Sequence, residues 1–383
     1  MTTWEAGAVS PRLLGSERPL TEIYDVALLD LDGVVYVGEQ PVPGASEALA
    51  AAREAGMRLA FVTNNASRTP QAVADRLTGM GVPAVADEVT TSAQAAARHL
   101  AEVLPAGSAV LVVGGEGLRS ALLDRGLRPV GAAVDVESGE PVAAVVQGFA
   151  PEVGWSMLAE AAVAIRAGAR WVATNLDRTI PSERGPLPGN GSLVHVLTFA
   201  FGATPESTGK PDPTMHQESV DRSGAERPVV VGDRLDTDIE GAVRVGAPSL
   251  LVLSGVTDGA ALLAAGVGER PDHVSRDVGG LLEAHPEVDW SDPSTTGVEL
   301  GRWSATVVDG RVRLSSTGSG PGSATGHDDA LDALRLITPA VWRCVDDGAA
   351  AGEAAGLVEP GDDAAAQVLT EWGIAAVRTT NGA

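Results

Sequence analysis

The fold is decided by a segment of thirteen residues, Val26-Ala27-Leu28-Leu29-Asp30-Leu31-Asp32-Gly33-Val34-Val35-Tyr36-Val37-Gly38. Its first four residues are aliphatic, which is typical of a strand buried on both faces of a parallel sheet. Asp30 and Asp32 follow at the carboxyl end of this strand, where open α/β sheets bind their ligands. Two carboxylates this close repel each other unless a cation or a shared proton holds them, and Mg²⁺ prefers such oxygen ligands. The segment therefore predicts a metal site, with a plain acidic turn as the alternative.

The composition limits the class of protein. A chain of 383 residues is long enough for two or three domains. The formal charge of −24 argues against nucleic acid or an anionic membrane surface as a partner. The single cysteine, Cys344, excludes an intramolecular disulfide and a cysteine-based zinc site. Because no apolar run reaches the length of a membrane helix, we expect no membrane insertion and a cytoplasmic protein.

A second strand is predicted over residues 58–62, and Thr63-Asn64-Asn65 follows it directly. A hydroxyl and several backbone amides at a strand end can cradle an anion. An Asn-rich turn with a helix cap explains the same residues equally well.

The middle of the chain reads as an α/β module inserted between two parts of the first sheet. Strands are predicted over 109–113, 141–146 and 170–174, and a helix over 151–167. The glycines near 114–117 resemble a dinucleotide loop only weakly, and a plain turn is favoured because no full fingerprint follows. The polar loop over 178–190 is either a binding element or a linker.

Two later motifs supply a lysine and another acid. Gly209-Lys210-Pro211 places a lysine in a loop, and a solvated surface lysine is the usual alternative there. Gly232-Asp233 follows the aliphatic run 229–231, and Thr237-Asp238 comes shortly after it. Several acids at one sheet edge, together with a lysine and a hydroxyl, indicate a shared site.

In order and in strand context, these four motifs resemble the haloacid dehalogenase superfamily over roughly residues 22–285. Thr63-Asn64-Asn65 and the position of the insert are similar to the subclass with a type-2 α/β cap, which includes the NagD-like and 4-nitrophenyl phosphatases. The segment 173–177 also matches the return segment of that cap. The resemblance implies an α/β fold with a Rossmann-like, doubly wound parallel sheet.

The resemblance implies a phosphatase that acts through an aspartyl-phosphate. Asp30 would be the nucleophile and Asp32 the general acid and base. Mg²⁺ would be held by Asp30, the backbone carbonyl of Asp32 and Asp233. Because the superfamily's dehalogenases lack a second acid at the position of Asp32, its presence favours phosphomonoester hydrolysis.

The remaining motif residues receive supporting roles by the same resemblance. Thr63, the Asn64 amide and Lys210 would bind the phosphoryl oxygens, and Asp238 would support the metal from behind its direct ligands. The candidates for substrate contacts beside the cap are Arg68, Asn175 and Asp177. The pattern is most similar to actinobacterial members that act on glycerol 3-phosphate, with 2-phosphoglycolate, a nucleotide or a sugar phosphate as alternatives.

The domains expected are a first core part (1–89), an inserted cap (90–192), a second core part (193–285) and a C-terminal extension (286–383). In the extension, Asp309-Gly310 predicts a hairpin between two strands, and a helix is expected from 328 to 336, ended by Pro339. The extension faintly resembles a truncated acetyltransferase and has no glycine-rich loop for acetyl-CoA.

Two hypotheses on function follow. The first is a Mg²⁺-dependent phosphatase of a small phosphorylated metabolite, and the second is an interaction protein that acts through its C-terminal extension. The intact set of motif residues favours the first. A homodimer through the cap and a monomer both stay open.

Overall fold

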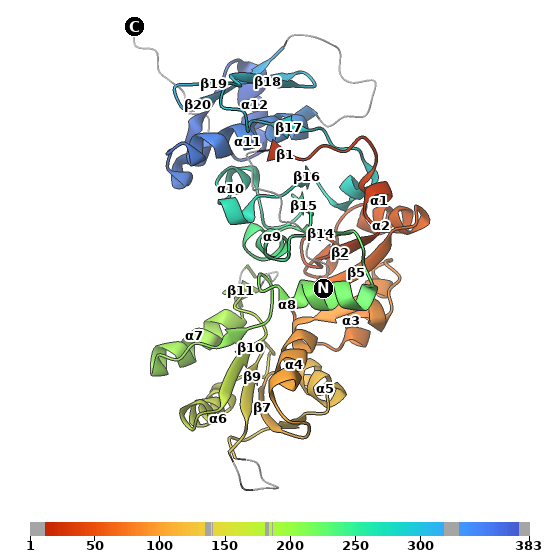
Figure 1. Ribbon diagram of the computed structural model, residues 1–383, viewed down its shortest axis with the longest axis vertical. Helices are drawn as coiled ribbons and strands as arrows, with labels where there is room; N and C mark the ends of the chain where they lie inside the picture. The colour runs from red at the N-terminus through yellow and green to blue at the C-terminus, as the bar shows by residue number, and fades with distance from the viewer. Residues whose placement is uncertain are drawn as a thin grey trace. The chain divides into compact units, whose positions relative to one another are not determined.

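The computed structural model describes residues 12–134, 139, 141–180, 184, 185, 187–317 and 329–374. The chain divides into two units. The middle unit comprises Val26–Ser46 and Arg58–Pro228, and the C-terminal unit comprises Met1–Asp25, Glu47–Met57 and Val229–Ala383. Each unit contains parallel strands connected by helices, which confirms the predicted α/β class (Figure 1).

The core of the middle unit begins with β2 (Val26–Leu29), which is buried along its whole length. It pairs in parallel with β5 (Arg58–Thr63), which in turn pairs with β6 (Val89–Thr91). Their helices are α3 (Pro70–Gly79), α4 (Ser92–Val103) and α8 (Thr214–Ser223), while β3 (Tyr36–Val37) and β4 (Gln40–Pro41) form a small hairpin. Thr91 caps α4, because its hydroxyl accepts the N–H of Gln94.

The middle of the chain forms a parallel sheet with the strand order β13-β10-β9-β7-β8. Its strands are β7 (Ala109–Val113), β8 (Arg128–Val130), β9 (Ala144–Gln147), β10 (Arg170–Ala173) and β13 (Glu206–Ser207). Side chains alternate between its faces: Val110 packs with residues of α4 and of α5 (Glu116–Asp124), whereas Leu111 packs with residues of α6 (Trp155–Arg166) and α7 (Asn190–Phe201). A two-stranded ribbon of β11 (Thr179–Ile180) and β12 (Leu187–Pro188) interrupts the loop predicted over 178–190, of which 181–183 and 186 lie outside the described residues.

The C-terminal unit contains a second set of parallel strands, in which β15 (Ser249–Val252) pairs with β14 (Pro228–Gly232) and β16 (His273–Ser275). A four-stranded sheet has the order β18-β19-β20-β21. Its strands are β18 (Gly297–Leu300), β19 (Trp303–Val308), β20 (Arg311–Ser316) and β21 (Val358–Pro360). The remaining elements are β1 (Arg12–Leu13), α1 (Leu20–Ile23), α9 (Glu240–Val245), α10 (Gly259–Leu263), β17 (Val288–Asp289), α11 (Asp329–Asp346) and α12 (Asp363–Glu371), while α2 (Ala45–Glu54) spans the boundary between the units.

The extension confirms one local prediction and corrects another. Asp309 and Gly310 both adopt positive φ angles, 51° and 72°, and connect β19 to β20 as a hairpin. The helix that we expected to end at Pro339 instead continues to Asp346. Because Ile337 and Val341, on either side of the proline, are fully buried, the packing of this apolar face outweighs the loss of one backbone hydrogen bond. Residue 328, the predicted start of this helix, lies outside the described residues.

None of the helices in the described part of the chain has the length and apolar character that crossing a bilayer requires.

Candidate active site

The first motif places two carboxylates in a tight turn after β2. The carbonyl of Leu31 accepts the N–H groups of Val35 and Tyr36, and Gly33 has a φ of 86°. A left-handed residue at this position favours glycine, which explains its place after the second acid. Asp30 and Asp32 therefore occupy the carboxyl end of the buried strand, as predicted for residues of a site.

Lys210 lies against Asp30. Its Nζ is 2.5 Å from Asp30 Oδ1 and 3.2 Å from the carbonyl oxygen of Val62. The lysine is only 3% exposed and the Asp30 side chain 13% exposed, so Lys210 is not a solvated surface residue. Two segments separated by 180 positions are thus joined by a largely buried ion pair. Such a pair holds the carboxylate of Asp30 beside a fixed positive charge.

Burial is the main cause of a raised pKa at Asp32. The positive charges of Arg76, Lys210 and Arg68 act in the opposite direction and partly offset that rise. A carboxyl group whose pKa is raised holds its proton more readily near neutral pH, which suits a general acid.

The second motif forms a compact turn after β5. The Thr63 side chain is 4% exposed, and its hydroxyl oxygen accepts the N–H of Asn65 at 3.1 Å. The next helix, α3, begins with a capping bond from the N–H of Ala72 to the hydroxyl of Thr69. Both local readings of this stretch, the turn with a helix cap and the anion cradle, are compatible with this geometry.

Asn175 and Asp177 both contact the second motif. Asn175 is 4% exposed, and its Nδ2 donates to the carbonyl oxygen of Asn64 at 2.7 Å. Asn64 Nδ2 lies 3.2 and 3.3 Å from the two carboxylate oxygens of Asp177. Arg68 is exposed and acts on Asp32 through its charge. All three candidates for substrate contacts therefore lie near residues of the first two motifs.

Sequence reasoning missed Arg76 and Tyr36. The guanidinium of Arg76 lies 4.3 Å from the centre of the Tyr36 ring and donates to the carbonyl of Gly38. Burial raises the pKa of Tyr36 far above its usual value. Arg76 is also the strongest positive influence on Asp32. A basic residue in the last turn of a helix is too common to signal this role.

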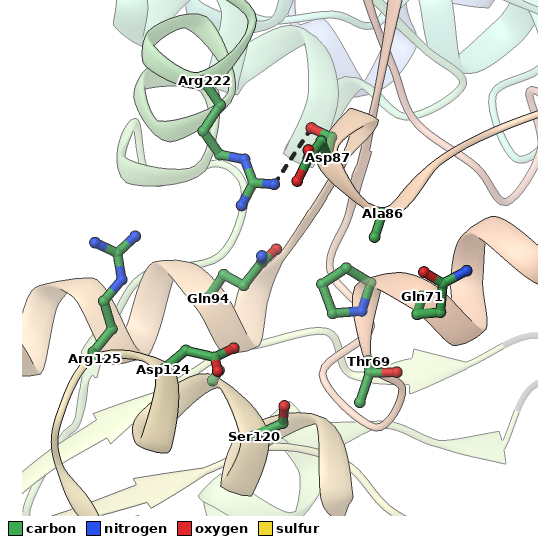
Figure 2. A pocket seen from close by; sticks show the side chains of 11 residues that line it. Thr69, Gln71, Ala86, Asp87, Gln94, Ser120, Asp124, Arg125 and Arg222 are labelled. Carbon is green, nitrogen blue, oxygen red and sulfur yellow. Dashed lines mark hydrogen bonds between the residues drawn. The ribbon is translucent and has the colours of Figure 1, made fainter.

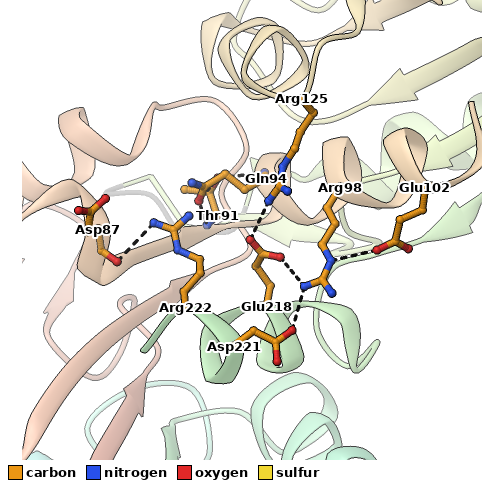
Figure 3. A network of polar contacts seen from close by, with 9 residues as sticks. All are labelled: Asp87, Thr91, Gln94, Arg98, Glu102, Arg125, Glu218, Asp221 and Arg222. Carbon is orange, nitrogen blue, oxygen red and sulfur yellow. Dashed lines mark hydrogen bonds and ion pairs between the residues drawn. The ribbon is translucent and has the colours of Figure 1, made fainter. Parts of the chain in front are cut away.

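An ion-pair network holds α8, the helix that follows Lys210 (Figure 3). Glu218 is 3% exposed and lies 2.6 Å from Arg98 on α4 and 3.0 Å from Arg125 at the end of α5. Arg98 also pairs with Glu102 and Asp221. Breaking a buried pair by removing one partner is costly, so this network ties α8 to α4 and α5.

A groove of about 600 Å³ lies beside this network (Figure 2). Its polar lining includes Gln94, Asp124, Arg125 and Arg222, and the Arg222 guanidinium donates to the backbone carbonyl of Asp87. None of the described residues that line it belongs to the four motifs. The groove is therefore distinct from the candidate active site.

The acidic motif of the C-terminal unit follows β14. Asp233 and Asp238 are each 1% exposed, and their carboxylate oxygens lie within 4.8 Å of each other. Asp233 Oδ2 accepts the N–H of Val256 at 2.6 Å, and Asp238 Oδ2 accepts the N–H of Arg234 at 3.2 Å. Buried carboxylates this close repel each other unless a cation balances them, and hard oxygen ligands match Mg²⁺. The residues present therefore fit a hard divalent cation.

Two family models match the regions that carry the motifs. A haloacid dehalogenase-like hydrolase model matches residues 27–128, and a HAD-hydrolase-like model matches residues 207–281. The D-glycerol 3-phosphate phosphatase of Mycobacterium tuberculosis is 41% identical over 363 residues, which cover 93% of this chain and 96% of the relative. The chain belongs to the haloacid dehalogenase-like hydrolase family. The resemblance that the motifs indicated is confirmed.

Solved structures support the same family. The crystal structure of the glycerol phosphate phosphatase of Mycobacterium tuberculosis in complex with magnesium matches with a TM-score of 0.79 and 41% identity, over 94% of this chain and 99% of that one. The p-nitrophenyl phosphatase of Archaeoglobus fulgidus matches with a TM-score of 0.61 and 30% identity, over 68% of this chain and 98% of that one. A GCN5-related N-acetyltransferase-like model matches residues 300–374, within the extension.

Proposed function

We propose that this chain is a Mg²⁺-dependent phosphatase that hydrolyses glycerol 3-phosphate through an aspartyl-phosphate on Asp30. The contact between Asp30 and the buried ammonium of Lys210 carries the proposal. A carboxylate beside a fixed cation can attack an anionic phosphoryl group, because the cation offsets the repulsion between the two negative charges.

The reaction divides into two displacements. An Asp30 oxygen attacks phosphorus in line while the bond from phosphorus to the alcohol oxygen breaks, and Asp32 gives its proton to that oxygen. Asp32 then takes a proton from water, which attacks the same phosphorus, and the bond to Asp30 breaks to release phosphate. The raised pKa of Asp32 supports the first role, since it favours the protonated acid.

Three groups are proposed to bind the phosphoryl oxygens: the Thr63 hydroxyl, the Asn64 backbone amide and the Lys210 ammonium. Mg²⁺ would be held by the carboxylates of Asp30 and Asp233 and by the backbone carbonyl of Asp32. Asp238, whose carboxylate is buried in the same loop as Asp233, would support Asp233. When bound, the ion neutralises charge on the phosphoryl group and orients it.

Glycerol 3-phosphate is proposed as substrate because the relative from Mycobacterium tuberculosis, which matches along nearly its whole length, bears that activity in its name. Arg68, Asn175 and Asp177 are proposed to contact the part of the substrate beyond the phosphate, since they lie near the first two motifs. The alternatives are 2-phosphoglycolate, nucleotides and sugar phosphates.

The test is phosphate release from a panel of these esters and 4-nitrophenyl phosphate, with Mg²⁺ and with chelator. We expect the highest kcat/KM for glycerol 3-phosphate, and loss of turnover with chelator and in Asp30→Asn. Preference for another ester would replace the substrate and keep the mechanism. Absence of metal-dependent turnover on every ester would refute the proposal.

We also propose a homodimer through the cap, located in the cytoplasm. The helices α6 and α7, which pack on one face of the cap sheet, expose Trp155 and Phe199, each by 84%. Large exposed aromatic side chains on neighbouring helices favour an interface. Light scattering is expected to give twice the mass of one chain, and Trp155→Glu with Phe199→Glu is expected to give one. A monomeric wild type would refute the dimer.

A further inference from the structure

We infer that Asn64 is a positioning residue that sets the Lys210 ammonium against Asp30 and links it to Asp177. The inference rests on the proposed function and adds to it, because the proposed function gives a role to the backbone amide of Asn64 and none to its side chain.

The side chain of Asn64 pairs with the main chain of Lys210 on both sides. Its Oδ1 accepts the Lys210 N–H at 2.9 Å, and its Nδ2 donates to the Lys210 carbonyl oxygen at 3.2 Å. The side chain of asparagine is short, so its amide group stays close to the end of β5, from which it projects. The two hydrogen bonds therefore fix the main chain of Lys210 relative to the end of β5. The Nζ of the same lysine reaches Asp30 and the Val62 carbonyl.

The same amide group also faces Asp177. Asn64 Nδ2 lies 3.2 and 3.3 Å from the two Asp177 carboxylate oxygens. The orientation of Asp177 is fixed in turn, because its N–H donates to Asn175 Oδ1 at 3.2 Å. Asn190, which is 1% exposed, donates to the Asn175 carbonyl at 2.8 Å. A chain of hydrogen bonds therefore runs from α7 to Lys210.

The backbone of Asn64 is also held by hydrogen bonds. Its carbonyl oxygen accepts hydrogen bonds from Asn175 Nδ2 at 2.7 Å and from Ser92 Oγ at 2.6 Å. These bonds come from two different segments, so the residue cannot shift toward one without breaking the other. Asn64 is thus held at both its backbone and its side chain, which is what positioning another residue requires.

Gly209 leaves the space that this arrangement needs. A Cβ at this position would lie 2.1 Å from the carbonyl oxygen of Thr174 and 2.9 Å from Asn64 Oδ1. Only a residue without a side chain lets the lysine motif approach both segments this closely. The approach brings the Lys210 N–H within reach of the Asn64 side chain.

The experiment compares Asn64→Ala and Asn64→Asp with wild type on 4-nitrophenyl phosphate with Mg²⁺. Misplacing a catalytic group by about 1 Å costs on the order of 100-fold in rate, so we expect kcat to fall by roughly 10- to 100-fold and KM to change by less than about threefold. Gln217→Ala is the matched control. It removes another amide-to-carboxylate bond, from Gln217 to Asp221, at an exposed position of α8.

A double variant separates the two arms of the network. Asn64→Asp places two carboxylates face to face, and adding Asp177→Asn returns a donor and an acceptor to that pair. We expect the double variant to recover at least fivefold in kcat over Asn64→Asp, and to stay below wild type because the bond to the Lys210 carbonyl is still missing. If Asn64 only stabilised the fold, its substitution would lower the melting temperature, and the double variant would not recover kcat.

Four results would count against the inference. Wild-type kcat in a folded Asn64→Ala would remove the positioning role, and wild-type kcat in the nearly isosteric Asn64→Asp would do so if the alanine variant does not fold. A double variant no faster than Asn64→Asp would remove the link to Asp177. An inactive wild type would refute the proposed function, and the inference with it, before any variant is compared.

Discussion

Replacing Lys210 by Met removes the charge beside Asp30, the proposed nucleophile, and keeps much of the side-chain volume. The ammonium is 3% exposed and 2.5 Å from Asp30, so it acts through a poorly solvated environment. Two unit charges about 4 Å apart interact by about 4 kcal/mol at an effective dielectric constant of about 20. Since each 1.4 kcal/mol of barrier is about tenfold in rate, we expect kcat to fall by about 1,000-fold.

The assay is release of 4-nitrophenol at saturating substrate and Mg²⁺. Lys210→Arg is the control for charge: it keeps the cation and changes its shape, so we expect it to retain more activity than Lys210→Met. A urea titration shows whether the variant is folded. A folded Lys210→Met with a kcat within tenfold of wild type would refute the assigned role of the ammonium.

The remaining predictions concern pH, the metal and stability. Arg76→Met removes the strongest influence that lowers the pKa of Asp32, so the pH at which kcat/KM falls on the alkaline side should rise; an unmoved profile would contradict this assignment. Gly255→Ala should weaken Mg²⁺ activation, because its Cβ would lie 2.0 Å from Asp233 Oδ2, whereas Gly268→Ala meets no atom within 4 Å and should not; equal Mg²⁺ titrations would count against the site. Burial lowers the pKa of three histidines, to about 3 for His216, about 3 for His273 and about 4 for His285. The pKa of a histidine in the unfolded chain is near 6.5, so the contribution of these three residues to the free energy of unfolding is fully present above that pH. It is lost as the pH falls toward their pKa values in the folded protein, by up to about 2 kcal/mol per histidine at pH 5. A urea midpoint that is equal at pH 7.5 and pH 5 would contradict it.

The local elements were predictable wherever a short stretch of chain carries its own signal. The aliphatic run before Asp30 forms a strand, and Asp309-Gly310 makes a hairpin turn. These features depend on neighbours a few residues away, so they can be read from the chain itself. Pro339 misled the same reasoning, because burial of the surrounding apolar face stabilises the helix through it.

The chemical character of the site was likewise present in the sequence. Carboxylates, a hydroxyl and a lysine at strand ends indicate a shared site, and the resemblance of these motifs to the haloacid dehalogenase superfamily implies phosphoryl transfer. Only the tertiary structure decided how these groups meet. The distance from Lys210 to Asp30, the charge of Arg76 near Asp32 and the pairing of Asn64 with Lys210 each join distant segments. Contacts of this kind depend on packing and on the exclusion of water, which no local pattern encodes.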